Sequence, residues 1–326
     1  MSEFDVIRHA SEEPVVTVGS RTLVVLNPAA GQADTEAVLR LLAGAFAVRG
    51  ASFDVYQTAA AGDAERAARS AAAQGYRAVV AVGGDGTVAE VITGLAGTGV
   101  PLAIVPKGTG NQVACNLGIP RDVEAAVEVA VNGVPAPIDL GQLDDGRYFA
   151  LAAGAGWDAA VMEVATREMK DRWGFAAYVF AGLRLGVSPP AADFRITADG
   201  QVLHVRAAMV LLANMAQIVA RVRPTFALPL APGASFQDGL LDVCIFAPRT
   251  LTDVAAVLWR VARGQWAGDQ RMIFLQARDV RIDADPPVVT EVDGELVGRT
   301  PLVARSVPGG ITVLVPPGAR PGQVGI

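Results

Sequence analysis

The sequence contains few of the residues on which many enzyme classes depend. Only two of its 326 residues are histidines, His9 and His204, so a histidine-based zinc site or a Ser-His-Asp triad has almost nothing to be built from. Its two cysteines, Cys115 and Cys244, lie far apart in apolar stretches. We interpret them as buried thiols rather than a disulfide, which predicts a protein of a reducing cytoplasm.

Long apolar runs and positive charge are also scarce. The longest uncharged stretch, Val91–Pro106, is broken by glycines and a proline and is shorter than the roughly 18 apolar residues of a membrane span. The formal net charge is −6, which argues against a nucleic-acid-binding protein, because such proteins need a basic stripe. Since 52% of the residues are hydrophobic and 18% charged, we expect a well-packed fold.

After a leader at 1–21, the N-terminal part alternates strands and helices. Apolar stretches at Thr22–Leu26, Ala78–Val82 and Leu102–Val105 are separated by segments with helical composition. This spacing is typical of βαβ units, and fully apolar strands suit a parallel sheet that is covered on both faces. We therefore predict a Rossmann-like α/β domain over residues 22–138.

The pattern changes after Pro137. Strand-like segments such as Val202–Leu212 now dominate, and Asp-Gly turns at Asp199-Gly200, Asp238-Gly239 and Asp293-Gly294 separate them. Leu251–Arg263 is predicted as a helix among these strands. We predict a mainly antiparallel domain over residues 139–310, with the C-terminal segment 311–326 a candidate to return to the first domain.

The clearest candidate site is the glycine-rich turn Gly83-Gly-Asp-Gly-Thr87, which follows an apolar strand and opens a helix. Glycines let the backbone approach a ligand closely, and the N–H groups that begin the helix favour an anion. Asp85 places a carboxylate in the same turn, which suits proton abstraction or magnesium binding. The alternative is a structural turn in which Thr87 and Glu90 form a capping box.

Two other nucleotide motifs fit less well. Gly84-x-Gly86-x-x-Ala89 matches a relaxed dinucleotide pattern, but the chain has no acidic residue between Glu90 and Asp122 to hold the ribose. A Walker A loop is excluded because no Gly-Lys pair is present.

Two further loops follow predicted strands in the same way: Asn27-Pro-Ala-Ala-Gly31 and Pro106-Lys-Gly-Thr-Gly-Asn111. The carboxyl ends of parallel strands meet at one edge of a sheet, so the three loops together predict a triphosphate site. The alternative for the last loop is a Thr109–Gln112 capping box.

In this order, the motifs resemble those of the diacylglycerol kinase catalytic family, which includes bacterial lipid kinases and sphingosine kinases. The resemblance extends from about Thr22 to Pro316. Besides the three loops, it rests on Thr58 with Gly62-Asp-Ala64, Gly154-Ala-Gly-Trp-Asp158, Asp238-Gly-Leu-Leu-Asp242 and Asp293-Gly-Glu295. It implies an α/β nucleotide-binding domain followed by an antiparallel β-sandwich domain, and phosphoryl transfer from ATP with Mg²⁺ to a lipid hydroxyl.

The resemblance also assigns residues. Asp85 and Glu295 are the implied catalytic carboxylates, although the sequence does not say which one takes the proton. Asp158 matches the position that contacts the lipid head group in sphingosine kinases, and Asp139, Asp238 and Leu240 match metal positions. The structural alternatives are hairpin turns at Asp238 and Asp293 and a helix cap at Asp158. The implied ATP-binding residues are Asn27, Pro28, Ala29, Ala30, Gly31, Thr58, Gly84, Asp85, Gly86, Thr87, Val88, Ala89, Glu90, Gly108, Thr109 and Asn111.

Two positions depart from the family pattern. Gln112 stands where bacterial diacylglycerol kinases usually carry aspartate, and an amide cannot act as a base or bind magnesium as a carboxylate does. Ala89 replaces a common asparagine. The first departure keeps open a lipid- or nucleotide-binding protein without activity. The turn Gly83–Thr87, which NAD kinases share, keeps open a kinase of a soluble acceptor such as NAD.

A lipid substrate also predicts peripheral contact with the inner face of the membrane. The candidate segments are Trp173–Leu185, for which a core helix is the alternative, and Val219–Leu230, which contains Arg221 and Arg223. A homodimer through sheet edges is a further expectation.

Overall fold

The fold is described from a computed structural model. It describes residues 6–7, 21–31, 34–157, 191–215, 217–219, 227–229, 231–232, 235–266 and 268–319. The chain divides into two compact units, one formed by residues 1–138 and 309–325 and the other by residues 139–308. The two boundaries fall inside strands β6 (Val134–Leu143) and β19 (Leu302–Val315).

The first unit is a parallel α/β fold. Its sheet has the order β1-β3-β2-β4-β5-β19. The register is parallel throughout, from Val6 opposite Val55 to Val313 opposite Leu102. The C-terminal strand thus pairs with β5 of this unit. The strands are β1 (Val6–Ile7), β2 (Arg21–Leu26), β3 (Ser52–Gln57), β4 (Ala78–Gly83) and β5 (Leu102–Pro106), and the helices are α1 (Thr35–Val48), α2 (Asp63–Ala73), α3 (Asp85–Leu95), α4 (Gln112–Asn116) and α5 (Val123–Asn132).

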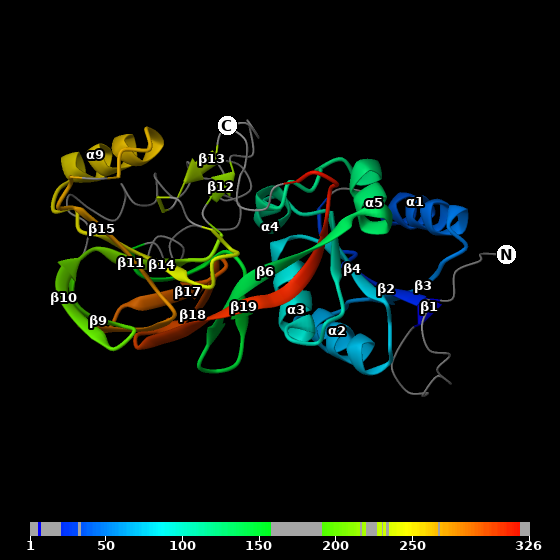
Figure 1. Cartoon of the computed structure of the whole chain (residues 1–326), viewed down its shortest axis with the longest axis horizontal. Coiled ribbons are helices and arrows are strands. Elements are labelled where there is room, and N and C mark those ends of the chain that lie inside the picture. The colour runs from blue at the N-terminus through cyan, green and yellow to red at the C-terminus, as the bar shows by residue number, and fades with distance from the viewer. Residues whose placement is uncertain are drawn as a thin grey trace. The chain divides into compact units, whose positions relative to one another are not determined.

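Helices cover both faces of this sheet, with α1 and α5 on one side and α2 and α3 on the other (Figure 1). Every residue of β4 and β5 is therefore buried. This burial explains why these strands are continuous apolar runs rather than alternating ones. Val6–Ile7, which lies in the segment predicted as a leader, pairs with β3 as a short strand.

Tyr76, a buried residue just before β4, makes a partly buried hydrogen bond to β3. Its hydroxyl donates to Asp54 Oδ2 at 2.7 Å, and Arg21 pairs with the same oxygen at 3.0 Å. Burial, followed by the hydrogen bond to Asp54, raises the pKa of Tyr76 to about 12.

We expect Tyr76→Phe to lower the free energy of unfolding by about 1 kcal/mol at pH 8, because the hydrogen bond is lost. A tyrosine pKa that is raised in the folded state contributes stability that is complete below about pH 10 and is lost as the pH rises toward 12. The difference between wild type and variant should therefore shrink between pH 10 and 12. Urea unfolding at pH 8 and pH 11 measures it, and a difference that does not change with pH would contradict this assignment.

The second unit is an antiparallel β-sandwich. One sheet has the order β19-β16-β9-β10 and the other β15-β14-β11-β8-β17-β18. The strands are β7 (Tyr148–Phe149), β8 (Ala152–Gly156), β9 (Ala192–Ala198), β10 (Gln201–Ala207), β11 (Met209–Ala213), β12 (Gln217–Val219), β13 (Ala227–Pro229), β14 (Leu241–Phe246), β15 (Met272–Ala277), β16 (Asp279–Asp285), β17 (Val289–Val292) and β18 (Glu295–Arg299), and one helix is α9 (Leu251–Ala262).

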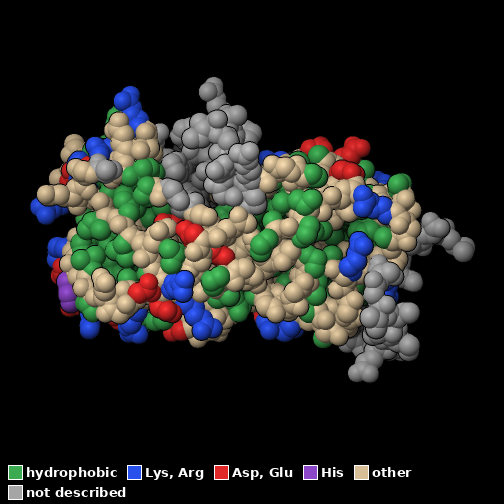
Figure 2. Space-filling model, viewed as in Figure 1, with side chains coloured by type: hydrophobic (Ala, Val, Ile, Leu, Met, Phe, Trp, Pro, Cys, Tyr) green, Lys and Arg blue, Asp and Glu red, His purple; other side chains and the backbone are tan. Residues whose placement is uncertain are grey.

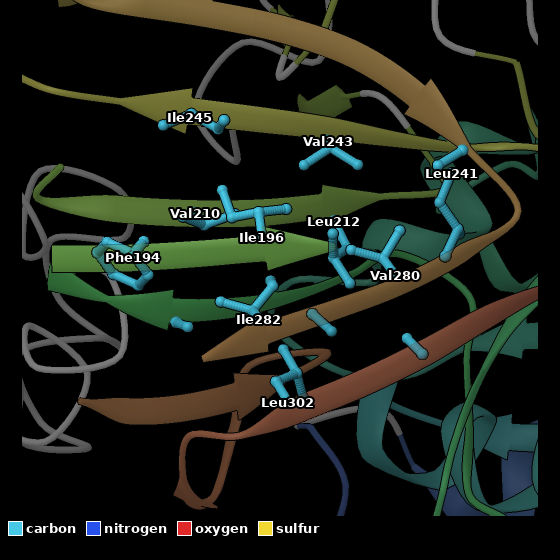
Figure 3. Packing of buried hydrophobic residues seen from close by; sticks show 14 of the residues in the cluster. Phe194, Ile196, Val210, Leu212, Leu241, Val243, Ile245, Val280, Ile282 and Leu302 are labelled. Carbon is cyan, nitrogen blue, oxygen red and sulfur yellow. The ribbon is translucent and has the colours of Figure 1, made fainter. Parts of the chain in front are cut away.

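The sandwich core lies between these two sheets. Figure 3 shows Phe194, Ile196 and Ile282 from one sheet facing Val210 and Ile245 from the other. All five side chains are at most 2% exposed. The chain changes sheets at Ala208: β10 pairs with β9, whereas β11 pairs with β8 and β14. The single strand predicted over Val202–Leu212 is therefore two strands of different sheets.

Helix α9 matches the predicted helix Leu251–Arg263 and begins with a capping box between Thr250 and Asp253. Within the described residues, no helix is long and apolar enough to cross a bilayer. Both cysteines are free thiols as predicted; Cys244 is buried and Cys115 is partly exposed. Asp158, the segment Trp173–Leu185 and the pair Arg221 and Arg223 lie outside the described residues.

Candidate active site

The three glycine-containing loops lie at the carboxyl ends of β2, β4 and β5, which are neighbours in the sheet. The backbone hydrogen bonds between neighbouring strands continue into the loops: Asn27 N–H donates to Val82 O at 2.9 Å, and Lys107 N–H donates to Gly83 O at 2.8 Å. Strand order therefore brings the loops to one sheet edge.

Side chains and close glycine contacts then join the loops. Asn27 Nδ2 donates to Thr87 Oγ1 at 3.0 Å. Gly84 and Gly108 touch backbone to backbone: a Cβ atom on Gly108 would lie 2.5 Å from the Gly84 Cα. A Cβ atom on Gly84 would lie 3.2 Å from the Gly108 Cα, so packing requires glycine at 108 and leaves little room for a side chain at 84.

Gly31 shows the tightest of these contacts. Its φ is +60°, and a Cβ atom there would lie 1.7 Å from the carbonyl oxygen of Lys107. The first loop can therefore pack on the third only if residue 31 is glycine.

We expect Gly31→Ala to weaken ATP binding and to lower the melting temperature. Gly50→Ala is the matched control, because Gly50 has a φ of +59° but no atom within 4 Å of the position that a Cβ would occupy. The control carries only the left-handed backbone penalty of roughly 1–2 kcal/mol, so the excess effect at Gly31 measures the loop contact. Thermal unfolding and calorimetric ATP titration measure both effects, and equal losses in the two variants would contradict this view.

Asp85 connects the second loop to helix α4. It is the first residue of α3, and its carboxylate accepts hydrogen bonds from the backbone N–H groups of Val113, Gln112 and Asn111; the bond from Val113 to Oδ1 is 3.3 Å long. Burial raises the pKa of Asp85, although these amides and the charge of Arg121 oppose the shift. A raised pKa brings the carboxylate closer to the range that suits a general base.

Glu90 attaches a fourth loop, Thr58–Gly62, and the start of α2 to helix α3. Its two carboxylate oxygens accept from Gly62 N–H at 2.9 Å and Ala64 N–H at 3.0 Å. Thr58 N–H in turn donates to Leu26 O at 2.9 Å. The predicted motif Thr58 with Gly62-Asp-Ala64 is thus placed beside the glycine loops.

Neither alternative capping box is formed. Helix α3 begins after Gly84 rather than at Thr87, whose hydroxyl accepts from Asn27, and Glu90 caps α2 instead. Helix α4 begins after Asn111, which makes no side-chain cap and instead exchanges hydrogen bonds with the backbone of Gly108. Asn111 has a φ of +52°, a conformation that asparagine tolerates better than most residues.

Two cations beside the loops were missed by the sequence analysis. Lys107 is 5% exposed, and its Nζ donates to Thr35 Oγ1 at the start of α1 at 2.7 Å. Arg121 donates to Gly110 O at 3.2 Å and interacts electrostatically with Asp85. The position of Lys107 inside the third loop was the one available signal; nothing local marks Arg121.

In the second unit, Glu295 lies at the start of β18, after the turn Asp293-Gly294 that closes the β17–β18 hairpin. Both turn residues have positive φ, +47° and +87°. Asp293 does more than form this turn, because its carboxylate accepts from the N–H groups of Ala150, Leu151 and Ala152 at 2.9–3.0 Å. The hairpin that carries the exposed Glu295 is therefore held against β8.

The predicted metal residues also fall in this unit. Asp139 is 4% exposed, and its Oδ2 accepts from Gly239 N–H at 2.7 Å, which places it against the Asp238–Leu240 loop. The Nε2 group of Gln276 donates hydrogen bonds to both Asp238 Oδ2 and Asp242 Oδ1, each 3.2 Å long. Burial raises the pKa of Asp242 to about 6, and the negative charge of Asp238 adds to this shift. The hydrogen bond from Gln276 opposes it.

This carboxylate pair suits a hard cation, because carboxylate and carbonyl oxygens are the donors that Mg²⁺ and Ca²⁺ prefer. Asp242 was not predicted as a member of the pair. No group of three acidic, histidine or cysteine side chains close enough to hold a metal ion occurs among the described residues.

Comparison with known proteins decides the family. The diacylglycerol kinase catalytic domain matches residues 21–143, and the YegS C-terminal NAD kinase beta sandwich-like domain matches residues 152–315. A diacylglycerol kinase of Bacillus subtilis is 31% identical over 284 residues, which cover 86% of this chain and 91% of that protein. This chain belongs to the diacylglycerol kinase family.

Two further relatives are similar to this chain over most of its length. The Staphylococcus aureus (strain MRSA252) diacylglycerol kinase is 27% identical over 86% of this chain and 88% of its own length. An uncharacterized Synechocystis protein, sll0036, is 31% identical over 74% of this chain, which covers 56% of that longer protein.

Among solved structures, a Bacillus anthracis protein aligns with a TM-score of 0.76 and 26% identity over 92% of this chain and 99% of its own. The α/β domain followed by a β-sandwich is thus the diacylglycerol kinase fold. Lipid kinase activity with ATP is the activity of the family.

Proposed function

We propose that this chain transfers the γ-phosphoryl group of ATP to the hydroxyl of a diacylglycerol-like lipid, with Mg²⁺, while in peripheral contact with the inner face of the membrane. The observation that carries the proposal is the cradle formed by four loops at one sheet edge. Four residues each connect one loop to another element of the cradle: Asn27, Gly31, Asp85 and Glu90. A kinase site needs such preorganised anion binding, because phosphoryl transfer depends mainly on positioning and electrostatics.

The triphosphate would lie over the exposed loop residues Pro28–Ala29, Gly86 and Thr109. Helix α3 directs its N-terminal N–H groups to this edge, which favours an anion there. Lys107 and Arg121 add positive charge close to the loops in a chain whose net charge is negative. Four of the predicted ATP-binding residues would act by shaping the cradle: Thr58, Gly84, Gly108 and Asn111.

Asp85 and Glu295 are the proposed catalytic carboxylates. One of them takes the proton from the acceptor hydroxyl, the freed oxygen forms a bond to the γ-phosphorus, and the bond to the ADP oxygen breaks. Bound Mg²⁺ would screen the phosphate charge in this reaction. Asp139 would support that ion through water, and Asp238, Asp242 and the Leu240 carbonyl would hold a structural cation. Asp158 as a head-group contact and a homodimer through sheet edges stay predictions.

The experiment is transfer of labelled γ-phosphate from ATP to acceptors in mixed micelles. The panel holds diacylglycerol, monoacylglycerol, phosphatidylglycerol, sphingosine, ceramide and NAD. A labelled lipid supports the proposal and identifies the acceptor class. Label on NAD alone would assign the chain to soluble-acceptor kinases, and ATP binding without any labelled product would indicate a binding protein. Gln112→Asp is the informative companion variant, because it restores the usual carboxylate beside Gly110 and Asp85.

A further inference from the structure

Helix α9 presents one face to the sandwich and another to solvent. Val257 and Val261 are buried in a cluster with Leu211 and Phe246 of the adjacent sheet. On the opposite face, the exposed residues follow each other at spacings of three and four, so they lie along one line of the helix. They are Thr252, Ala255, Trp259 and, directly after the helix, Arg263.

Trp259 is an unusual residue on this face. Its exposure is 60%, and it is the only aromatic residue among the large exposed hydrophobic side chains of the described chain. The guanidinium of Arg263 lies 4.1 Å from the centre of the Trp259 ring. Tryptophan is normally largely buried in a soluble protein, so an exposed one paired with a cation suggests an interaction surface.

The charge around α9 differs from that of the whole chain. Residues 249–271 contain four arginines and two aspartates, although the full sequence has a net charge of −6. The two aspartates, Asp253 and Asp269, both pair with Arg271 at 2.8 Å. Arg249 and Arg263, at the two ends of the helix, have no ion-pair partner in the described part of the chain. Figure 2 shows basic and apolar side chains together over α9.

We propose that this α9 surface, comprising Arg249, Thr252, Ala255, Trp259 and Arg263, docks on an anionic phospholipid bilayer. Tryptophan favours the membrane–water interface, because its ring is apolar and its N–H is polar. The arginines bury their stems and keep their charges at the lipid phosphates. The inference rests on the proposed function, since a lipid acceptor must be reached at a membrane. It places the contact on a segment different from Trp173–Leu185 and Val219–Leu230.

The test is co-sedimentation of the full chain with vesicles of phosphatidylcholine alone and with phosphatidylglycerol added. We expect wild type to bind the anionic vesicles and to be released by salt. Trp259→Ala should weaken binding several-fold. Arg263→Gln should weaken it by about fivefold, the equivalent of roughly 1 kcal/mol per basic residue, and Arg263→Lys should restore most of it. Val202→Ala and Arg206→Gln, exposed residues of β10, are matched controls that should bind like wild type.

Tryptophan emission gives a second measurement. Anionic vesicles should shift the emission to shorter wavelength in wild type, and Trp259→Phe should lose most of that shift. Equal binding by wild type, Trp259→Ala and Arg263→Gln would overturn the proposal. Wild type that ignores phosphatidylglycerol, or controls that lose binding equally, would overturn it as well.

Kinase assays separate this inference from the proposed function. A short-chain, monomeric diacylglycerol should be phosphorylated equally by wild type and Trp259→Ala, whereas the variant should be slower on vesicles. If neither acceptor is phosphorylated by wild type, the proposed function fails while vesicle binding still decides the role of α9. If Trp259→Ala is equally fast on vesicles, the inference fails while the proposed function stands.

Discussion

Asp85→Asn should reduce kcat by about two to four orders of magnitude, the usual contribution of a positioned acid or base. Asparagine has nearly the same shape and keeps one carbonyl acceptor for the backbone N–H groups of residues 111–113, which Asp85 now binds. The connection between α3 and α4 should therefore persist, and ATP affinity should change much less than kcat. Initial rates with a lipid acceptor and calorimetric ATP titration measure the two quantities.

The pH profile of wild type adds a second requirement. A base must be deprotonated to act, so activity should fall as the pH falls through the pKa of Asp85. Burial raises that pKa, and the acidic limb of kcat/KM should lie above the ordinary aspartate range.

Asp122→Asn is the matched control, because Asp122 also accepts a backbone N–H, that of Ala125 at 2.9 Å, but does so as the N-cap of α5. Its activity should be close to that of wild type. An Asp85→Asn enzyme within tenfold of wild type, or an equally inactive control, would remove Asp85 from the reaction.

The candidate site could be predicted best where it depends on the order of the strands in the sheet. Loops that follow successive apolar strands are expected to meet, because parallel strands point the same way. The loops do meet in the structure: Gly31 contacts the Lys107 carbonyl, and Asn27 donates a hydrogen bond to Thr87. The glycines at 31, 84 and 108 could be recognised in advance, because each lies in a loop that follows a buried strand.

Roles that depend on distant partners could not be predicted. Glu90 lies three residues after Thr87, so a capping box was the local alternative to a role in ATP binding, but the packing of α2 on α3 brings Gly62 and Ala64 to its carboxylate instead. Asp293 looks like an ordinary turn residue, yet it binds the N–H groups of a strand about 140 positions away in sequence. Nothing near either residue in the chain encodes these partners.

The second unit shows the same limit at the level of strands. Residues 202–212 form an uninterrupted strand-like stretch, and the change of sheet at Ala208 leaves no glycine or proline as a signal. The hydrogen bonds that join Asp238 and Asp242 likewise come from the side chain of Gln276 on the neighbouring strand β15. Tertiary pairing, rather than local preference, determines both features.

Glu295→Gln should abolish most turnover without affecting the fold. Glu295 is exposed at the start of β18, and its carboxylate makes no hydrogen bond within the described part of the chain. Its charge interacts with Arg147, which is paired mainly with Asp145, so removing that charge should change the melting temperature only slightly. If the carboxylate takes the acceptor proton or organises the metal, kcat should fall by about two to four orders of magnitude. Rates on the identified lipid and thermal unfolding of the same preparation provide the measurement.

Glu291→Gln, on the same hairpin, supplies the contrast. Glu291 is 4% exposed and accepts the N–H of Gly294 at 2.9 Å, so its replacement acts on the hairpin that carries Glu295. We expect this variant to lose stability, by about 1–3 kcal/mol, and activity only in proportion to the folded fraction. An active Glu295→Gln enzyme would leave Asp85 as the only proposed base. Loss of stability in both variants would instead make Glu295 a structural residue, because a group that acts only on the reaction cannot change the unfolding equilibrium.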